Sequence, residues 1–384
     1  MRAARGLGIV GWGAAGRLMA EAVSRTSRFR LAGIADVNAV ARERAAAEAG
    51  CAVYAEAEQL CSAADIDVVY VASPTAHHLA AVRSAAMNGK DIICEKPLAC
   101  QIDDAQQAVE AARAAGVILL VGATHSYDAP FRVLRRVVAD DRLGPLLAVC
   151  STCHTDWHRR PRSAADLDAG QGNGLVLRQG AHLVDILRYV CGGKAATVSG
   201  STFGGCAGTE LGFSAQLIFE NGVHATAHYT GTGGFDSRLL TWGIGELGTV
   251  DIEPNPALTP YFVLPGSTMA PPVSPVLGTT VATFAQGGAW VTPAGLLLLN
   301  GSGVEEITST DEPSGWDAVL AELDSVAAGL SPVHSGEWAL ATLEVCLAVH
   351  ESARTGGPVA LQHQVGVVSE PMPARPARRR TDDH

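Results

Sequence analysis

The stretch LGIVGWGAAGRLMAEAVSRTSRFRLAGIAD, residues 7–36, contains the pattern that decides the fold. A short apolar run is followed by Gly11, Gly13 and Gly16 in G-x-G-x-x-G spacing. A helical segment comes next, and then a second apolar run that ends in Asp36. This order of strand, glycine turn, helix, strand and acid is typical of a dinucleotide-binding unit.

Each glycine of this turn has its own physical task. Gly11 allows the tight turn, and Gly13 lacks a Cβ, so a pyrophosphate can approach the backbone. Gly16 lets the helix pack close to the strand, and the helix N-terminus attracts phosphate. Asp36 can accept hydrogen bonds from a ribose diol. The alternative is a tight turn in another α/β protein, with Asp36 capping the next helix.

The composition excludes several classes of protein. The chain has 384 residues, 47% of them hydrophobic, and a formal net charge of -11, which argues against nucleic-acid binding. No apolar run is long enough to cross a bilayer, and the start MRAARGLG leaves no room for a signal peptide. Nine irregularly spaced cysteines are typical of free thiols in a reducing compartment, so we expect a cytoplasmic protein.

Cys150 and Cys153 form a C-x-x-C, with His154 and His158 close behind. A zinc site is the alternative for this cluster, but the sequence has no second C-x-x-C. We therefore interpret the two cysteines as strand residues and expect no metal.

Strand-like and helix-like segments alternate from residue 7 to about residue 124. This alternation predicts a parallel, doubly wound sheet, in which ligands bind beyond the carboxyl ends of the strands. Gly16, Asp36, Pro74 and Lys96 follow such ends and are expected to share one cleft. The apolar runs are Leu7–Val10, Leu31–Ala35, Val68–Ala72, Ile92–Cys94 and Ile118–Val121, with helical segments such as Ala14–Arg25, Ala76–Asn88 and Asp103–Ala115 between them.

The pattern changes after residue 125 to alternating runs typical of antiparallel strands. Asn221-Gly222 between two such runs predicts a hairpin. The expected strands are Leu146–His154, Glu210–Phe219, Val223–Thr230, Arg238–Trp242, Gly248–Ile252 and Gly295–Leu299, with a proline-rich loop at 254–276. The expected helices are Pro130–Asp140, Arg178–Val190, Trp316–Leu330 and Ser335–Arg354.

These patterns together predict an α/β chain with two domains. Residues 1–124 form an N-terminal Rossmann domain with a doubly wound parallel sheet. Residues 125–360 form an α+β domain with a large open, mostly antiparallel sheet, and residues 361–384 form a largely disordered tail. An open sheet face is usually buried by a partner subunit, so we expect a homo-oligomer, a dimer or tetramer.

Two further segments contain chemically active side chains. DIICEKP, residues 91–97, places Lys96 at the cleft, where an ammonium beside a nicotinamide can hold the substrate oxygen and relay its proton. A surface Glu95–Lys96 pair is the alternative. In VLRQGAHLVDILRYV, residues 176–190, Arg178, His182 and Asp185 share one helix face. That stripe suits a hydroxylated, anionic ligand, or it is a solvated helix face.

Together these residues resemble the Gfo/Idh/MocA oxidoreductase family, and the resemblance covers nearly the whole chain. The matching pieces are GIVGWGAAG at 8–16, Asp36, ASPTAHH at 72–78, CEKP at 94–97 and GAHLVD at 180–185. The resemblance implies a Rossmann domain followed by a domain with a large open sheet, often used for oligomerisation.

The resemblance also implies a role for individual residues. Lys96 and His182 match the pair that binds the reacting hydroxyl and transfers its proton, and Asp185 matches the aspartate one turn later. Ser73 and Thr75 replace the threonine and asparagine of the family's T-P-N-x-x-H segment. The residues expected to bind the dinucleotide are Gly11, Gly13, Ala14, Ala15, Gly16, Asp36, Ser73, Pro74, His78, Glu95 and Pro97.

Arg178 departs from the family pattern. Sugar and inositol dehydrogenases of the family usually carry an aspartate there, whereas an arginine stays protonated and can grip a carboxylate with two hydrogen bonds. The segment HTDWHRRPRSAADLD, residues 154–168, adds three arginines and an aromatic ring suited to a flat substrate. The combined pattern resembles the phthalate 4,5-cis-dihydrodiol dehydrogenase branch. The expected substrate contacts are Arg178, Asp185, Trp157, Arg160 and Arg162, with Arg159 an open alternative to its neighbours.

We therefore predict an NAD-dependent dehydrogenase that oxidises a secondary alcohol of a cyclic, carboxylated substrate by hydride transfer. Asp36 favours NAD over NADP because an acid repels a 2′-phosphate, although Asn38 and Arg42 nearby weaken that argument. Two alternatives stay open. One is a sugar or cyclitol dehydrogenase of the same family, and the other is a non-catalytic dinucleotide-binding regulatory protein.

Overall fold

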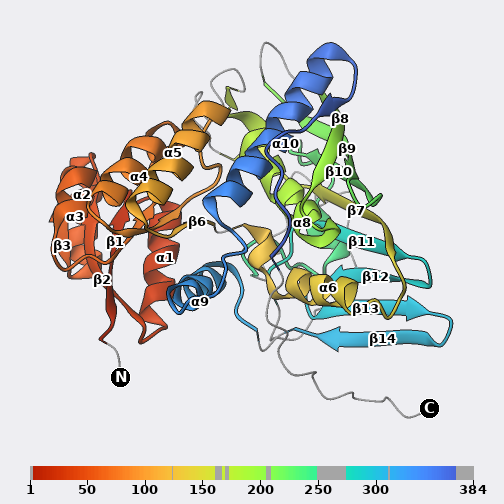
Figure 1. Cartoon of the computed structure of the whole chain (residues 1–384), viewed down its shortest axis with the longest axis horizontal. Helices are drawn as coiled ribbons and strands as arrows, with labels where there is room; N and C mark the ends of the chain where they lie inside the picture. Colours follow the sequence, from red (N-terminus) through yellow and green to blue (C-terminus); the bar gives the residue numbers. More distant parts are fainter. Residues whose placement is uncertain are drawn as a thin grey trace.

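The computed structural model shows two domains that lie against each other (Figure 1). It describes residues 3–122, 124–160, 167–168, 173–204, 209–248, 274–309 and 312–368. No helix in these ranges is both long and apolar enough to cross a membrane.

The N-terminal domain is built on a parallel six-stranded sheet in the order β3-β2-β1-β4-β5-β6. This is the Rossmann order, with the topological switch between β1 and β4, so the predicted fold is confirmed. Its strands are β1 (Arg5–Val10), β2 (Phe29–Ala35), β3 (Ala52–Tyr54), β4 (Val68–Val71), β5 (Asp91–Cys94) and β6 (Leu119–Val121). Its helices are α1 (Ala14–Ser24), α2 (Ala39–Ala49), α3 (Ala57–Ser62), α4 (His78–Met87) and α5 (Ile102–Ala115).

The second domain contains a nine-stranded sheet in the order β14-β13-β12-β11-β7-β10-β9-β8-β15. Every described pair of neighbours is antiparallel except β7 with β10, so the predicted open, mostly antiparallel sheet is also confirmed. The strands are β7 (Leu146–His154), β8 (Ala195–Phe203), β9 (Gly212–Phe219), β10 (His224–Thr230), β11 (Thr279–Phe284), β12 (Gly287–Thr292), β13 (Gly295–Asn300), β14 (Gly303–Thr308) and β15 (Val359–Ala360). The helices that follow β6 are α6 (Ala129–Ala139), α8 (Ala181–Cys191), α9 (Gly315–Ala327) and α10 (Gly336–Thr355).

The predicted β9–β10 hairpin is confirmed, with Gly222 at φ +81° in its turn. The predicted strand Arg238–Trp242 is wrong. The Asp236 side chain accepts a hydrogen bond from the Arg238 N–H and starts the 3-10 helix η6 (Ser237–Leu240) instead. The expected strand at 248–252 and the proline-rich loop lie almost entirely outside the described residues.

Residues 361–368, which were expected to belong to a disordered tail, are bound to the second domain. Leu361 and Val367 donate backbone hydrogen bonds to Ala196 and Gly192, and Gln364 bonds to Arg188. These contacts fix residues up to 368 on the second domain, and residues 369–384 lie outside the described part of the chain.

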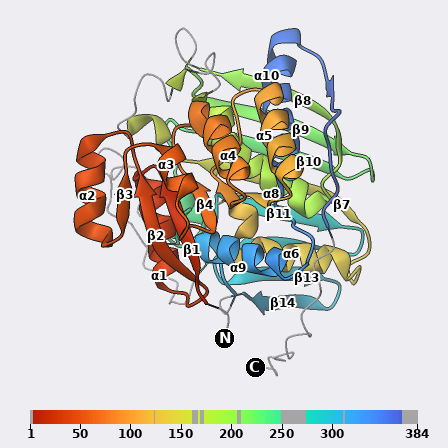
Figure 2. The same cartoon turned by 60° about the vertical axis from the view of Figure 1, so that its left-hand side comes forward.

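Two C-terminal helices join the domains. α9 packs on α1, and its Val319 and Leu323 enter the core around Leu7 and Ile9. α10 packs on α5, on α8 and on β8 (Figure 2). The carboxyl ends of the Rossmann strands therefore face the start of α8, and the candidate site lies at this junction.

Candidate active site

The glycine turn has the shape that a pyrophosphate requires. Gly11 has φ +101°, and a Cβ there would lie 2.6 Å from the Ala72 carbonyl oxygen. A Cβ on Gly16 would lie 2.2 Å from the Gly11 oxygen, so the helix packs directly on the turn. A Cβ on Gly13 would meet nothing within 4 Å. Gly13 precedes Ala14 at the N-terminus of α1, so open space adjoins the helix end that attracts phosphate.

Asp36 is fixed against this turn at the end of β2. One carboxylate oxygen accepts from Trp12 N at 2.8 Å and the other from Asn38 N at 2.8 Å. The Arg42 guanidinium donates to the backbone oxygens of Asp36 and Val37 at 2.9 and 3.0 Å. An acid and a cation thus lie close together where the ribose of a dinucleotide is expected.

His78 links the loops that follow β4 and β5. Its Nε2 lies 2.9 Å from the Ser73 oxygen and its Nδ1 lies 3.0 Å from the Pro97 oxygen. Burial lowers the pKa of His78, and a neutral ring can donate to only one of these two oxygens. The Ser73 hydroxyl is buried and has no partner among the described residues, so it is available to a ligand in this cleft, whereas Pro74 is exposed.

Glu95 is held from two sides. Tyr70 donates its hydroxyl hydrogen to Glu95, and Trp316 of α9 donates to the Tyr70 oxygen at 3.0 Å. The backbone N–H of Lys96 donates to the second carboxylate oxygen at 3.2 Å. The Lys96–Pro97 peptide bond is cis.

The Lys96 side chain connects the two domains. Its Nζ donates to the backbone oxygen of Arg178 at 2.7 Å. Arg178 belongs to a π-helical turn, η5 (Val176–Gly180), that leads directly into α8. Such turns often occur at functional sites, and their i→i+5 bonds alter the spacing of side chains along the helix. The simple i, i+4 relation between Arg178 and His182 therefore does not hold across this turn.

His182 lies on α8, and every residue of that helix is buried, which excludes the solvated-face alternative. The side chain of His182 is 6% exposed, and its Nδ1 has no hydrogen-bond partner among the described residues. Its pKa lies well below the usual histidine value, first because of burial and then because of the nearby charges of Lys96 and His125. The ring is thus neutral at neutral pH and can accept a proton.

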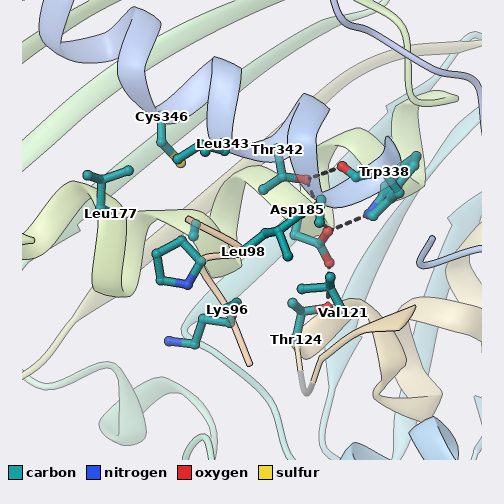
Figure 3. A pocket seen from close by; sticks show the side chains of 13 residues that line it. Lys96, Leu98, Val121, Thr124, Leu177, Asp185, Trp338, Thr342, Leu343 and Cys346 are labelled. Carbon is teal, nitrogen blue, oxygen red and sulfur yellow. Dashed lines mark hydrogen bonds between the residues drawn. The ribbon is translucent and has the colours of Figure 1, made fainter. Parts of the chain in front are cut away.

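Asp185 was expected to contact substrate, but the protein occupies both of its oxygens. One accepts from Thr124 Oγ1 at 2.7 Å and from Ser126, and the other accepts from Trp338 Nε1 at 2.6 Å and from Thr342 Oγ1 at 3.4 Å. Figure 3 shows this carboxylate turned toward Trp338 and Thr342, with Lys96 on the other side of a small, mostly apolar cavity. The geometry makes Asp185 a structural anchor.

The structure places the other expected substrate contacts in different surroundings. The prediction that Trp157 stacks on a ligand is wrong, because its side chain is 1% exposed and belongs to the core. Arg160 pairs with Asp156 at 2.8 Å and with Glu246 at 3.5 Å, beside a second cavity.

Arg159 donates to the Thr232 backbone oxygen at 2.9 Å, and Arg162 lies outside the described residues. Arg178 is half-buried, and its charge acts on the Cys100 thiol in the loop that follows Pro97. Of the described arginines considered for substrate, Arg178 is the one placed next to Lys96.

His125 and Asp128 were not among the site residues predicted from the sequence. His125 lies beside His182, with ring centroids 4.6 Å apart, and its Nδ1 lies 2.7 Å from a carboxylate oxygen of Asp128. The available signal was THSYD directly after the last Rossmann strand, since residues at such ends face the ligand cleft.

Cys150 and Cys153 lie in β7 as expected, with Cys150 exposed and Cys153 buried. They point to opposite faces of the sheet. In the described part of the chain, no group of three histidine, cysteine or acidic side chains is arranged to hold a metal ion.

The fold and the cleft define a class, the nicotinamide-dependent oxidoreductases with a Rossmann domain. Residues 5–123 match the model of the oxidoreductase family with an NAD-binding Rossmann fold, and residues 131–250 match the Gfo/Idh/MocA C-terminal domain. The chain belongs to the Gfo/Idh/MocA family of oxidoreductases.

Curated relatives include the 1-carboxy-3-chloro-3,4-dihydroxycyclohexa-1,5-diene dehydrogenase of Comamonas testosteroni. It is 28% identical over 383 residues, which cover 91% of this chain and 94% of the relative. Inositol 2-dehydrogenase 2 of Saccharopolyspora erythraea is 29% identical over 74% of this chain and 84% of its own length.

Solved structures share the fold. One from Bordetella bronchiseptica RB50 is 29% identical, with a TM-score of 0.85 over 93% of this chain and 100% of the other. An oxidoreductase from Agrobacterium radiobacter, in complex with NAD+, L-tartaric acid and magnesium, is 18% identical, with a TM-score of 0.71 over 93% of this chain and 98% of its own.

Proposed function

We propose that this chain is an NAD-dependent dehydrogenase that oxidises a secondary alcohol on a cyclic, carboxylated substrate of the cis-dihydrodiol type. The observation that carries the proposal is the 2.7 Å hydrogen bond from Lys96 Nζ to the Arg178 backbone oxygen. It places an ammonium group at the start of α8, one turn before the neutral ring of His182.

The side chains divide the work of alcohol oxidation. The Lys96 ammonium donates a hydrogen bond to the substrate hydroxyl oxygen and stabilises the negative charge that develops there. His182 accepts the hydroxyl proton, for which its lowered pKa keeps it ready. Bound NAD supplies the hydride acceptor. The open space at Gly13 and the unpartnered Ser73 hydroxyl fit this cofactor.

Arg178 and the relative from Comamonas testosteroni support a carboxylated ring as substrate. That relative is named for a carboxylated cyclohexadiene diol, and the half-buried Arg178 gives this chain a guanidinium suited to a carboxylate. The test is an assay of NAD reduction on a phthalate-type cis-dihydrodiol, with inositol and glucose as comparison substrates. A strong preference for inositol would favour the second candidate, a cyclitol dehydrogenase, which the inositol dehydrogenase relatives support.

Arg178→Asp is expected to lower kcat/KM for a carboxylated cis-dihydrodiol by about 10- to 150-fold, which corresponds to the loss of a charge-assisted hydrogen bond of roughly 1.5–3 kcal/mol. The matched substrate is the same diol without its carboxylate, and its kcat/KM is expected to change far less. Equal losses on both substrates would show that Arg178 does not grip a carboxylate.

Asp36→Asn is expected to reduce the preference for NAD over NADP by about tenfold, because the variant removes the charge that repels a 2′-phosphate. Asparagine keeps an oxygen that can accept from the backbone N–H of Trp12 or Asn38. Arg42→Ala is the matched control and should shift the preference toward NAD. The measurement is kcat/KM with each coenzyme, and an unchanged ratio in Asp36→Asn would remove Asp36 from this role.

We also propose that the chain works in the cytoplasm as a homo-oligomer. The eight cysteines that the structure describes are free thiols, which suits a reducing compartment. The large sheet exposes Ile218 on β9, Val281 on β11 and Leu299 on β13, and burial of this face by a second copy would remove them from water. Sedimentation of the full chain measures its subunit number.

A further inference from the structure

Behind His182 lies a buried pair that the chemistry above does not use. His125 begins the 3-10 helix η2 (His125–Tyr127), and its ring is tilted 57° to that of His182 at a centroid distance of 4.6 Å. His125 is 9% exposed and Asp128 is 1% exposed. His125 therefore contacts both other side chains, the His182 ring on one side and the Asp128 carboxylate on the other.

The Asp128 side chain bonds to His125 and does not cap its own helix. It occupies the N-cap of α6, where an aspartate normally accepts a hydrogen bond from the first helical turn and stabilises the helix. No such bond forms here. One carboxylate oxygen instead lies 2.7 Å from His125 Nδ1, and the other accepts from the Gly315 N–H at 3.1 Å. At the helix start, the Ser314 hydroxyl accepts from Ala129 N at 3.0 Å. The residue that usually caps a helix therefore holds a histidine ring.

This arrangement fixes which His125 nitrogen is free. The carboxylate holds a hydrogen on Nδ1, so Nε2 is left as the acceptor in the neutral ring. His182 Nδ1 is buried without a hydrogen-bond partner among the described residues, so the two rings are in contact here without a hydrogen bond between them. The charged and titratable groups that act on His182 are Lys96, from the loop after β5, and His125; Asp128 and then Arg132 lie behind His125.

We propose that His125, held by Asp128, is the positioning residue that receives the proton His182 takes from the substrate. In the first step the substrate O–H bond breaks and an N–H bond forms on His182. In the second, the two rings turn until Nδ1 of His182 donates to Nε2 of His125. His182 then gives up its Nδ1 proton and an N–H bond forms at His125 Nε2, so the positive charge ends beside the Asp128 carboxylate. His182 is then neutral again. This inference rests on the proposed function, because it takes His182 as the first proton acceptor.

His125→Asn tests the relay in turnover. Asparagine can still donate to Asp128 but cannot take a proton, so kcat is expected to fall about tenfold or more while NAD affinity and KM stay near wild type. Asp128→Asn should lower kcat similarly, and the double variant should be no worse than His125→Asn alone, because both changes break one path. Additive losses would contradict the relay.

A titration separates this inference from the proposed function. In wild type, burial and then the nearby charges of Lys96 and His125 hold the pKa of His182 well below the usual histidine value. His125→Asn removes the contribution of His125, so NMR of labelled histidines should show the His182 pKa raised. The acid limb of kcat should move to higher pH in parallel. An unchanged His182 titration in both His125→Asn and Asp128→Asn would overturn the proposal.

His334→Asn is the matched control. His334 is 2% exposed, and its Nδ1 lies 2.7 Å from Glu322, so it forms an equally buried histidine–acid pair that is not among the groups that lower the His182 pKa. Its loss is expected to lower stability without moving the His182 pKa. If the wild-type chain oxidised none of the alcohols offered, the proposed function would fail, yet the NMR titration would still decide whether His125 sets the protonation of His182.

Discussion

Lys96→Ala is expected to lower kcat by about 10³-fold, at the upper end of what the loss of one hydrogen-bond donor to a developing oxyanion costs. The variant removes the only ammonium that the described structure places beside His182, and with it the hydrogen bond to the Arg178 oxygen. NAD affinity should stay near the wild-type value, because the glycine turn, Asp36 and Ser73 are left intact. Steady-state rates with the preferred alcohol and calorimetric titration of NAD measure the two quantities separately.

Lys90→Ala is the matched control for this experiment. Lys90 also lies in the Rossmann domain, and its Nζ donates to the backbone oxygens of Ala63 and Ile66 at 3.1 and 2.8 Å. Lys90→Ala therefore removes a lysine that bonds to backbone carbonyls outside the site, and it should leave kcat unchanged. A Lys96→Ala enzyme with wild-type turnover would remove Lys96 from the chemistry, whereas equal losses in both variants would point to a general effect on folding.

The parts of the site that could be predicted from sequence are those set by local backbone geometry. Gly11 is required because its φ is +101° and a Cβ would meet the Ala72 oxygen, so the glycine spacing carries this information directly. The order of strands and helices then places Asp36 and Lys96 at one edge of the sheet. The position of His182 beside Lys96 followed from the family resemblance, since no local rule relates residues so far apart in the chain.

The rest depends on contacts between distant elements. Trp157 stands in a polar, arginine-rich segment, yet tertiary packing buries it in the core of the second domain. Asp185 shares a helix with His182, but donors from η2 and α10 surround it, and α10 is remote in sequence. The His125–His182 contact joins η2 to α8, and neither segment carries a spacing that predicts the other. The residues of the π-helical turn before α8 likewise carry no pattern that predicts it.

Asp185 also gives the second large expected effect, and this effect is on stability. Asp185→Ala is expected to lower the free energy of unfolding by about 3–5 kcal/mol, as when one partner of a buried charged network is removed. The hydroxyls of Thr124 and Ser126 and the indole N–H of Trp338 lose their acceptor. Arg188 is fully buried over the Trp338 ring, and burial lowers its pKa to about 10; Asp185→Ala removes the first of the negative charges that oppose this shift.

Urea unfolding of Asp185→Ala measures this loss, and Asp317→Ala is its control. Asp317 pairs with Arg25 at 2.9 Å on the surface, where such pairs contribute roughly 0–1 kcal/mol, so the control should unfold close to wild type. The same experiment decides between the two roles considered for Asp185. A variant with wild-type stability and a raised KM would return Asp185 to the substrate site, whereas a large loss of stability with KM retained in the folded fraction would establish it as the anchor of α8. Because His182 lies on that helix, the anchor would then fix the proton acceptor in place by packing and hydrogen bonding alone.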